Sequence, residues 1–140
     1  TLHVEGIEDL SGNVLASAAD RSFSTGTGAD LVPTGVVQYS PANATNNVGL
    51  NTKVVVSFNE RLNPLTVNSD SVALYDTTNG QRLAGSTALS ADGKTVTLTP
   101  TAALAVNRQY YVYVSYWAYL YDQAGNRMNY TYWTFTTGAS

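Results

Sequence analysis

Two short loops with the pattern D-x-x-G-N are the best candidates in the sequence for binding a metal ion. One runs from Asp122 to Asn126 and the other from Asp9 to Asn13. Their carboxylate, amide and backbone oxygens are hard ligands that suit Ca²⁺, which takes about six to eight oxygens. Asp and Asn also stabilise turns by bonding to the backbone, while Gly accepts a positive φ. The pattern therefore predicts either a purely structural turn or a calcium site shared with Asp30.

Tyrosine and tryptophan side chains crowded into residues 110–133 form the second candidate site. Planar aromatic rings stack on sugar rings and anchor protein contacts. Because alternate residues of a strand point to opposite faces, two neighbouring strands here would share one exposed tyrosine face. The candidate binding residues are Tyr111, Tyr113, Tyr116, Trp117, Tyr119, Tyr130 and Tyr132. A glycan ligand, a protein partner, and aromatic pairing that only stabilises the sheet are all open explanations.

Catalytic chemistry finds little support in the sequence. His3 is the single histidine, and the chain has no cysteine. Glu60 would need a partner carboxylate to act as a glycosidase, so we expect a loop carboxylate bonded to the backbone or to Arg61. The glycines lie at turns rather than in the strand–GxGxxG–helix context of a nucleotide site. We therefore predict no enzyme activity, and no cofactor other than calcium.

The composition excludes several classes of partner. The 140 residues carry a net charge of −3, which argues against nucleic acid and against an anionic membrane surface. No apolar run approaches the roughly 20 residues of a membrane helix, so no membrane insertion is expected. The charged fraction of 12% is low, while Thr, Ser, Asn, Gly and Tyr are abundant. This balance is typical of a β-rich extracellular module.

The elements that must position these residues are short strands separated by turn signals. Asn79-Gly80 and Asp92-Gly93 are turn dipeptides, and the runs around them alternate or are β-branched. The expected strands are 35–40, 52–58, 71–75, 81–89 (one or two weak strands), 95–99, 109–115 and 131–137. They predict an all-β fold, a seven-stranded antiparallel immunoglobulin-like β-sandwich, with a small closed barrel as the alternative. Tyr110 is expected either to bond back to the loop at Leu104, as a tyrosine corner does, or to be an ordinary core tyrosine.

The sequence also contains an internal repeat. Asp9, Gly12 and Asn13 match Asp122, Gly125 and Asn126, and Phe23, Thr25 and Gly26 match Phe135, Thr137 and Gly138. We therefore predict that residues 1–26 are the C-terminal strand pair of a preceding repeat. Residues 27–34 are then a linker, and residues 35–138 are one complete domain.

The predicted strand pair at 1–26 lacks the rest of its own sandwich. An isolated hairpin is only marginally stable in water, so its apolar side chains need cover. These side chains are Val4, Ile7, Leu10, Val14, Leu15 and Phe23. We expect them to pack on the complete domain, or to complement another molecule by strand addition, which would give self-association through residues 1–26.

Several motifs together resemble the bacterial immunoglobulin-like domains of S-layer and surface-adhesin proteins. They are Ser40-Pro41-Ala42 with Val48, the run VVVSFNERLNP at 54–64, SADGKTVTLTP at 90–100, Leu104 with Tyr110, then DQAGN and FTTG. The resemblance covers residues 35–138 and, as a truncated copy, 1–26. It implies a non-catalytic spacer or adhesive module in a tandem array of a secreted or surface-anchored protein, with neighbouring repeats as partners. The Tyr/Trp-rich stretch 110–133 departs from the pattern and leaves a glycan or surface protein open as a further partner.

Overall fold

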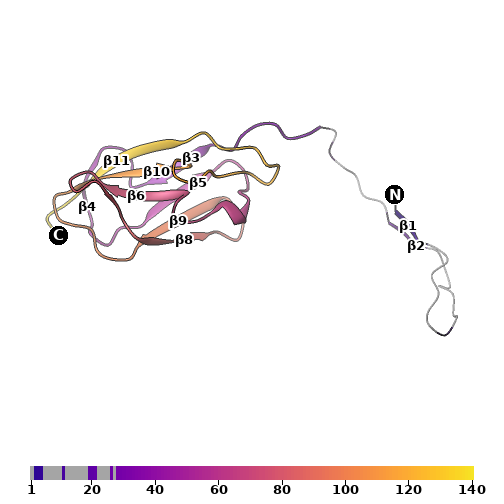
Figure 1. Ribbon diagram of the computed structural model, residues 1–140, viewed down its shortest axis with the longest axis horizontal. Coiled ribbons are helices and arrows are strands. Elements are labelled where there is room, and N and C mark those ends of the chain that lie inside the picture. Colours follow the sequence, from indigo (N-terminus) through magenta and orange to yellow (C-terminus); the bar gives the residue numbers. More distant parts are fainter. Residues whose placement is uncertain (1, 5–10, 12–18, 22–25, 27) are drawn as a thin grey trace.

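The computed structural model describes residues 2–4, 11, 19–21, 26 and 28–140. Near the N-terminus, β1 (Leu2–Val4) pairs antiparallel with β2 (Ala19–Arg21) in a two-stranded sheet of its own. This pair lies apart from the other strands in Figure 1. Most of the apolar residues predicted to need cover, and the loop residues Asp9 and Asn13, lie outside the described residues.

The rest of the described chain forms a sandwich of two sheets (Figure 1). The first has the order β3-β5-β9-β8 and the second the order β4-β11-β10-β6-β7. Their bounds are β3 Val36–Ser40, β4 Thr45–Val48, β5 Val54–Phe58, β6 Val72–Asp76, β7 Gln81–Arg82, β8 Gly85–Leu89, β9 Thr95–Pro100, β10 Gln109–Val114 and β11 Thr131–Thr137. Two separate sheets confirm the sandwich over the barrel. In the described ranges the single helical segment is the 3₁₀ turn η1, Pro64–Thr66, and no helix is long and apolar enough to cross a membrane.

The core lies between the two sheets and follows the alternation of the strands. On β5, Val54, Val56 and Phe58 are buried, and the residues between them are half-buried. The same alternation buries residues of the neighbouring strand β9 and of β10 and β11 in the second sheet, namely Val96, Leu98, Tyr110, Val112, Val114, Trp133 and Phe135. Each such side chain stabilises the fold by about 1.5–3 kcal/mol through burial alone. The predicted inward faces of these strands are confirmed.

Tyr110 forms the predicted tyrosine corner. Its ring is buried against Phe135, and its hydroxyl oxygen accepts a hydrogen bond of 2.9 Å from the backbone N–H of Ala105. Leu104, the residue before, is buried in the core. The bond ties the loop that precedes β10 to the strand itself, which fixes the position at which β10 enters the second sheet.

The described part of residues 35–138 contains nine strands rather than the seven expected. The segment 81–89 divides into β7 and β8, which belong to different sheets. The strand β4 was not predicted, because the sequence TNNV has no apolar alternation. It is held through its backbone: it pairs in parallel with β11, and Gly138 N donates to Val48 O at 2.9 Å.

Candidate functional site

The pairing of three strands brings the predicted tyrosines onto one face of the second sheet. In the register of β10 and β11, Tyr113 lies opposite Tyr132. In the register of β10 and β6, Tyr111 lies opposite Tyr75. Since the intervening residues of β10 point into the core, these tyrosines point away from it. The shared face agrees with the prediction from strand alternation, although Tyr75 was not among the predicted residues.

Seven aromatic side chains on this face contact one another; we call them the aromatic face. They are Tyr75, Tyr111, Tyr113, Tyr116, Trp117, Tyr130 and Tyr132. Tyr113 lies at the centre, with the ring centroid of Tyr116 at 4.9 Å and that of Tyr132 at 5.9 Å. The rings of Tyr130 and Tyr132 are nearly parallel, at an angle of 10° and a centroid distance of 6.4 Å. Mutual ring contacts of this kind stabilise the arrangement of these side chains.

The outer rings of the aromatic face remain open to solvent. Trp117, Tyr130 and Tyr132 are 53%, 58% and 54% exposed, whereas Tyr113 is half-buried. Together they form one exposed aromatic surface on the outer side of the second sheet. Tyr119 lies outside the aromatic face: its ring packs against the Arg127 guanidinium, whose carbon is 4.6 Å from the ring centroid.

The aromatic face carries little charge. Burial, together with the neighbouring phenols of Tyr111 and Tyr116, raises the pKa of Tyr113 above its ordinary value of 10.0. The Tyr113 hydroxyl therefore remains neutral and able to donate a hydrogen bond at any physiological pH. At the edge of the face, Arg82 forms an ion pair with Asp70, which neutralises its charge.

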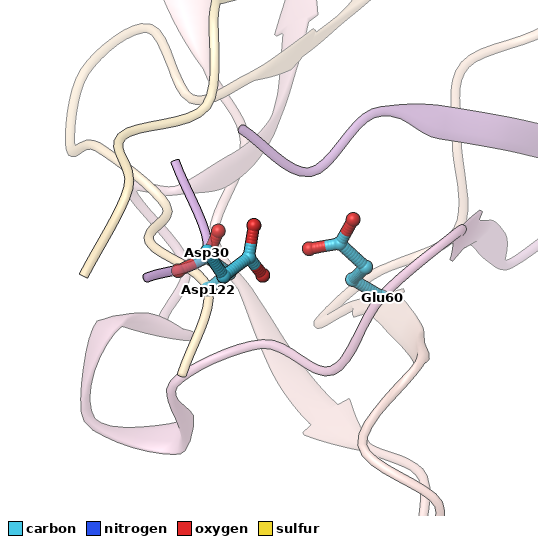
Figure 2. A group of neighbouring side chains, drawn as sticks. All are labelled: Asp30, Glu60 and Asp122. Carbon is cyan, nitrogen blue, oxygen red and sulfur yellow. The ribbon is translucent and has the colours of Figure 1, made fainter. Parts of the chain in front are cut away.

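A second cluster joins three carboxylates near the start of the sandwich. Figure 2 shows the Glu60 side chain directed toward Asp30 and Asp122, and one oxygen from each residue lies within 4.8 Å of the others. The sequence alone predicts a bond from Glu60 to the backbone or to Arg61. No ion pair joins Glu60 to Arg61 in the described part of the chain, and Glu60 is the metal-ligand candidate that the sequence analysis missed.

The loop at Asp122 forms a hydrogen-bonded turn, which is one of the two interpretations that its sequence left open beside a calcium site. Asp122 is 2% exposed, and its carboxylate accepts hydrogen bonds of 2.9 Å from both the backbone N–H and the side-chain amide of Asn126. Burial acts to raise the pKa of Asp122, but these hydrogen bonds outweigh it and hold the pKa below 3.8. Asn126 also donates to the backbone oxygen of Asp30 at 2.9 Å. Asn126 thus serves as a donor to this cluster, and the loop attaches the linker to the domain.

The carboxylate cluster leads to a prediction about Glu60. Three neighbouring negative charges repel one another, so Glu60→Gln should raise the free energy of unfolding in EDTA by a few tenths of a kcal/mol. Melting curves in EDTA and in millimolar calcium measure the effect. If the cluster binds calcium, the melting temperature of the parent chain is higher in calcium than in EDTA. Glu60→Gln then shows no such increase. Equal melting temperatures of the parent chain in both buffers would reduce the loop to a structural turn.

The chain matches known proteins in family and in fold. The family model described as "Bacterial Ig-like domain" matches residues 30–137. No curated protein matches the chain. Among solved structures, domains 1–6 of the surface layer protein SbsC align with a TM-score of 0.58 at 20% identity, covering 76% of this chain and 14% of that one. The chain thus spans a small part of that protein's length.

Two shorter proteins share the fold over nearly their whole length. CopC from Methylosinus trichosporium OB3b aligns with a TM-score of 0.61 at 18% identity, covering 75% of this chain and 93% of CopC. PcoC, a copper resistance protein from Escherichia coli, aligns with a TM-score of 0.60 at 17% identity, covering 74% and 98%. At these identities the structural matches establish the immunoglobulin-like sandwich and nothing finer.

Proposed function

Because the chain belongs to the bacterial Ig-like domain family, we propose that it is a non-catalytic spacer or adhesive module of a larger secreted or surface-anchored bacterial protein. The observation that carries this proposal is the path of the chain through the sandwich. The linker enters β3 at one end, and the C-terminus leaves at the opposite end (Figure 1). Domains with this geometry can be joined end to end in a row, which agrees with the repeat found in the sequence.

The amino-acid composition suits a module that works outside the cell. Cross-strand hydrogen bonds and a single apolar core hold the domain together without cysteine. Neighbouring repeats are the partners that the proposal requires, and the location is extracellular or on the cell surface. The fold shared with PcoC, a copper resistance protein, does not extend to copper chemistry in this proposal. The chain has one methionine, the buried Met128, one histidine and no cysteine, whereas soft thiolate and thioether ligands select Cu(I).

The proposal predicts that the domain is accessible on intact cells. Antibodies raised against the 140-residue chain should label unbroken cells of the source bacterium or their culture medium, and external protease should remove the cell-surface signal. Labelling of a cytoplasmic protein serves as the control for leakage. Signal that appears only after lysis would contradict the proposal.

A second candidate function is ligand binding by the aromatic face. The observation that favours it is the open side of the ring cluster, where Trp117, Tyr130 and Tyr132 are about half exposed. Pairing that merely stabilised the sheet would be satisfied by the half-buried rings of Tyr75, Tyr111 and Tyr113. The outer rings extend the aromatic surface beyond those pairs, as a docking surface for a glycan or a protein would require.

A further inference from the structure

A cavity of about 370 Å³ lies at one edge of the aromatic face. It is lined by Tyr75 of β6, Gly80 of the turn after β6, Arg82 of β7 and Trp117 of the segment after β10. Small-ligand sites have volumes of this order, with mostly aromatic walls and a few polar groups that set orientation. Two aromatic rings and one guanidinium group meet that description.

Gly80 lines this cavity with backbone in the left-handed region. Its φ is +68°, and a β-carbon at this position would lie 3.4 Å from the hydroxyl oxygen of Tyr75. A side chain here would therefore contact the Tyr75 hydroxyl and occupy part of the cavity. Gly80, the second residue of the Asn79-Gly80 turn signal, thus also belongs to the cavity beside Tyr75.

Arg82 supplies the polar wall of the cavity, but it does not make the cavity favour an anionic ligand. Its ion pair with Asp70 neutralises the charge, and both side chains are about half exposed. A guanidinium group has five N–H donors in a planar fork. Those not engaged by Asp70 remain able to donate to hydroxyl oxygens of a neutral ligand.

We propose that the aromatic face binds a neutral polysaccharide, with one sugar ring seated in this cavity between Tyr75 and Trp117. The proposal rests on the second candidate function and names its ligand. The members of the face are all Tyr or Trp, which combine a flat apolar ring with a polar tip. Such rings match the apolar faces and the hydroxyl groups of a sugar, whereas lipid chains would call for aliphatic side chains.

The extent and charge of the face set the kind of glycan. From Trp117, contacting rings continue through Tyr113 and Tyr132 to Tyr130, with successive centroids 6.3, 5.9 and 6.4 Å apart. A polymer of repeating sugars suits such a series better than a single monosaccharide does. Among the described residues, the one cation that lines the cavity is Arg82, and its pairing with Asp70 argues against sulfated or uronic acid polymers.

Affinity electrophoresis of the whole chain tests the proposal. Native gels containing hydroxyethyl cellulose, galactomannan, yeast mannan or glycogen serve as neutral probes, and alginate gels serve as the acidic probe. We expect at least one neutral polymer to retard the chain, and alginate to leave it unretarded. Trp117→Ala should weaken that binding by about tenfold or more, since it removes one wall of the cavity.

Two further variants separate the cavity from the fold. Gly80→Asn should also weaken binding, because Asn tolerates a positive φ and its side chain enters the space beside Tyr75. Tyr119→Ala is the matched control: it removes an equally exposed aromatic ring outside the aromatic face and should leave binding unchanged. Melting temperatures of all three variants should stay close to that of the parent chain, which excludes unfolding as the cause of a loss.

Three results would overturn the proposal. If none of the neutral polymers retards the chain, neutral polysaccharides are excluded as the ligand. If Tyr132→Ala loses binding while Trp117→Ala binds fully, the glycan binds to the aromatic face but not in the cavity. A purified protein partner whose binding needs Trp117, with no polysaccharide bound, assigns the face to a protein. None of these results bears on whether the domain is displayed on the cell surface, so the failure of either proposal is recognisable.

Discussion

Trp133→Ala is expected to lower the free energy of unfolding by about 3–5 kcal/mol, the largest effect of any substitution considered for this domain. Trp133 is 4% exposed and belongs to the core between the two sheets. Its indole N–H donates a 2.8 Å hydrogen bond to Pro41 O, and its ring packs on Tyr39 with centroids 4.2 Å apart. Alanine leaves a cavity and also deprives the buried Pro41 oxygen of its donor.

Tyr132→Ala provides the matched comparison for Trp133→Ala. Tyr132 is the preceding residue of β11 but points to the opposite side of the sheet, where its ring is 54% exposed. We expect a loss below about 1 kcal/mol, because only ring contacts on the open face are removed. Chemical denaturation of both variants measures the difference. A similar loss in the two would mean that the aromatic face is part of the structural core and is not available for binding.

This contrast also shows what the sequence was able to predict about the fold. Strict alternation assigned Val112, Trp133 and Phe135 to the core and the tyrosines between them to the outer face, because the side-chain period of a strand leaves no other choice. The strand β4 escaped prediction because its attachment to β11 is made through the backbone. Backbone pairing of a polar segment has no signature in the order of side chains.

The sequence could predict only those residues of the candidate site that come from two strands adjacent in the chain. Tyr113 and Tyr132 could be placed together from the pairing of two strands adjacent in the sequence. Tyr75 was missed because β6 pairs with β10 from a distant part of the chain. Glu60 was missed for the same reason: it approaches Asp122 only after the sandwich has formed. Contacts between distant segments depend on the order of strands in the sheets, which local patterns do not determine.

The aromatic face and the spacer role make different demands on the same sheet. A spacer requires only the buried side of β10 and β11, so its residues tolerate substitution on the outer side. Ligand binding requires the outer side and a firm sheet beneath it. Because neighbouring positions such as Tyr132 and Trp133 belong to opposite sides, the two roles can be removed separately by mutation. The Arg108–Asp76 pair provides a further test of the sheet itself.

Asp76→Ala is expected to lower the free energy of unfolding by about 2–3 kcal/mol at neutral pH. Asp76 is buried at the end of β6, where its carboxylate accepts a 2.9 Å bond from the Arg108 guanidinium and a 2.8 Å bond from the Thr78 backbone N–H. Alanine leaves the half-buried Arg108 without its partner. Asp70→Ala breaks the more exposed pair with Arg82 and should cost below about 1 kcal/mol, so it serves as the control.

The same carboxylate gives the domain a defined dependence on acid. Burial acts to raise the pKa of Asp76, but the hydrogen bonds from Thr78 and Arg108 outweigh it and hold the pKa below 3.8. The folded state therefore binds this proton less readily than the unfolded state does. The stabilisation is complete above pH 3.8 and is lost as the pH falls through the lower pKa of the folded state. Urea denaturation from neutral pH down to the acid limit should show the parent chain losing stability in that window, and Asp76→Ala losing distinctly less. Parallel pH profiles for the two proteins would contradict the assignment, because the loss of stability would then belong to other carboxylates such as Asp122.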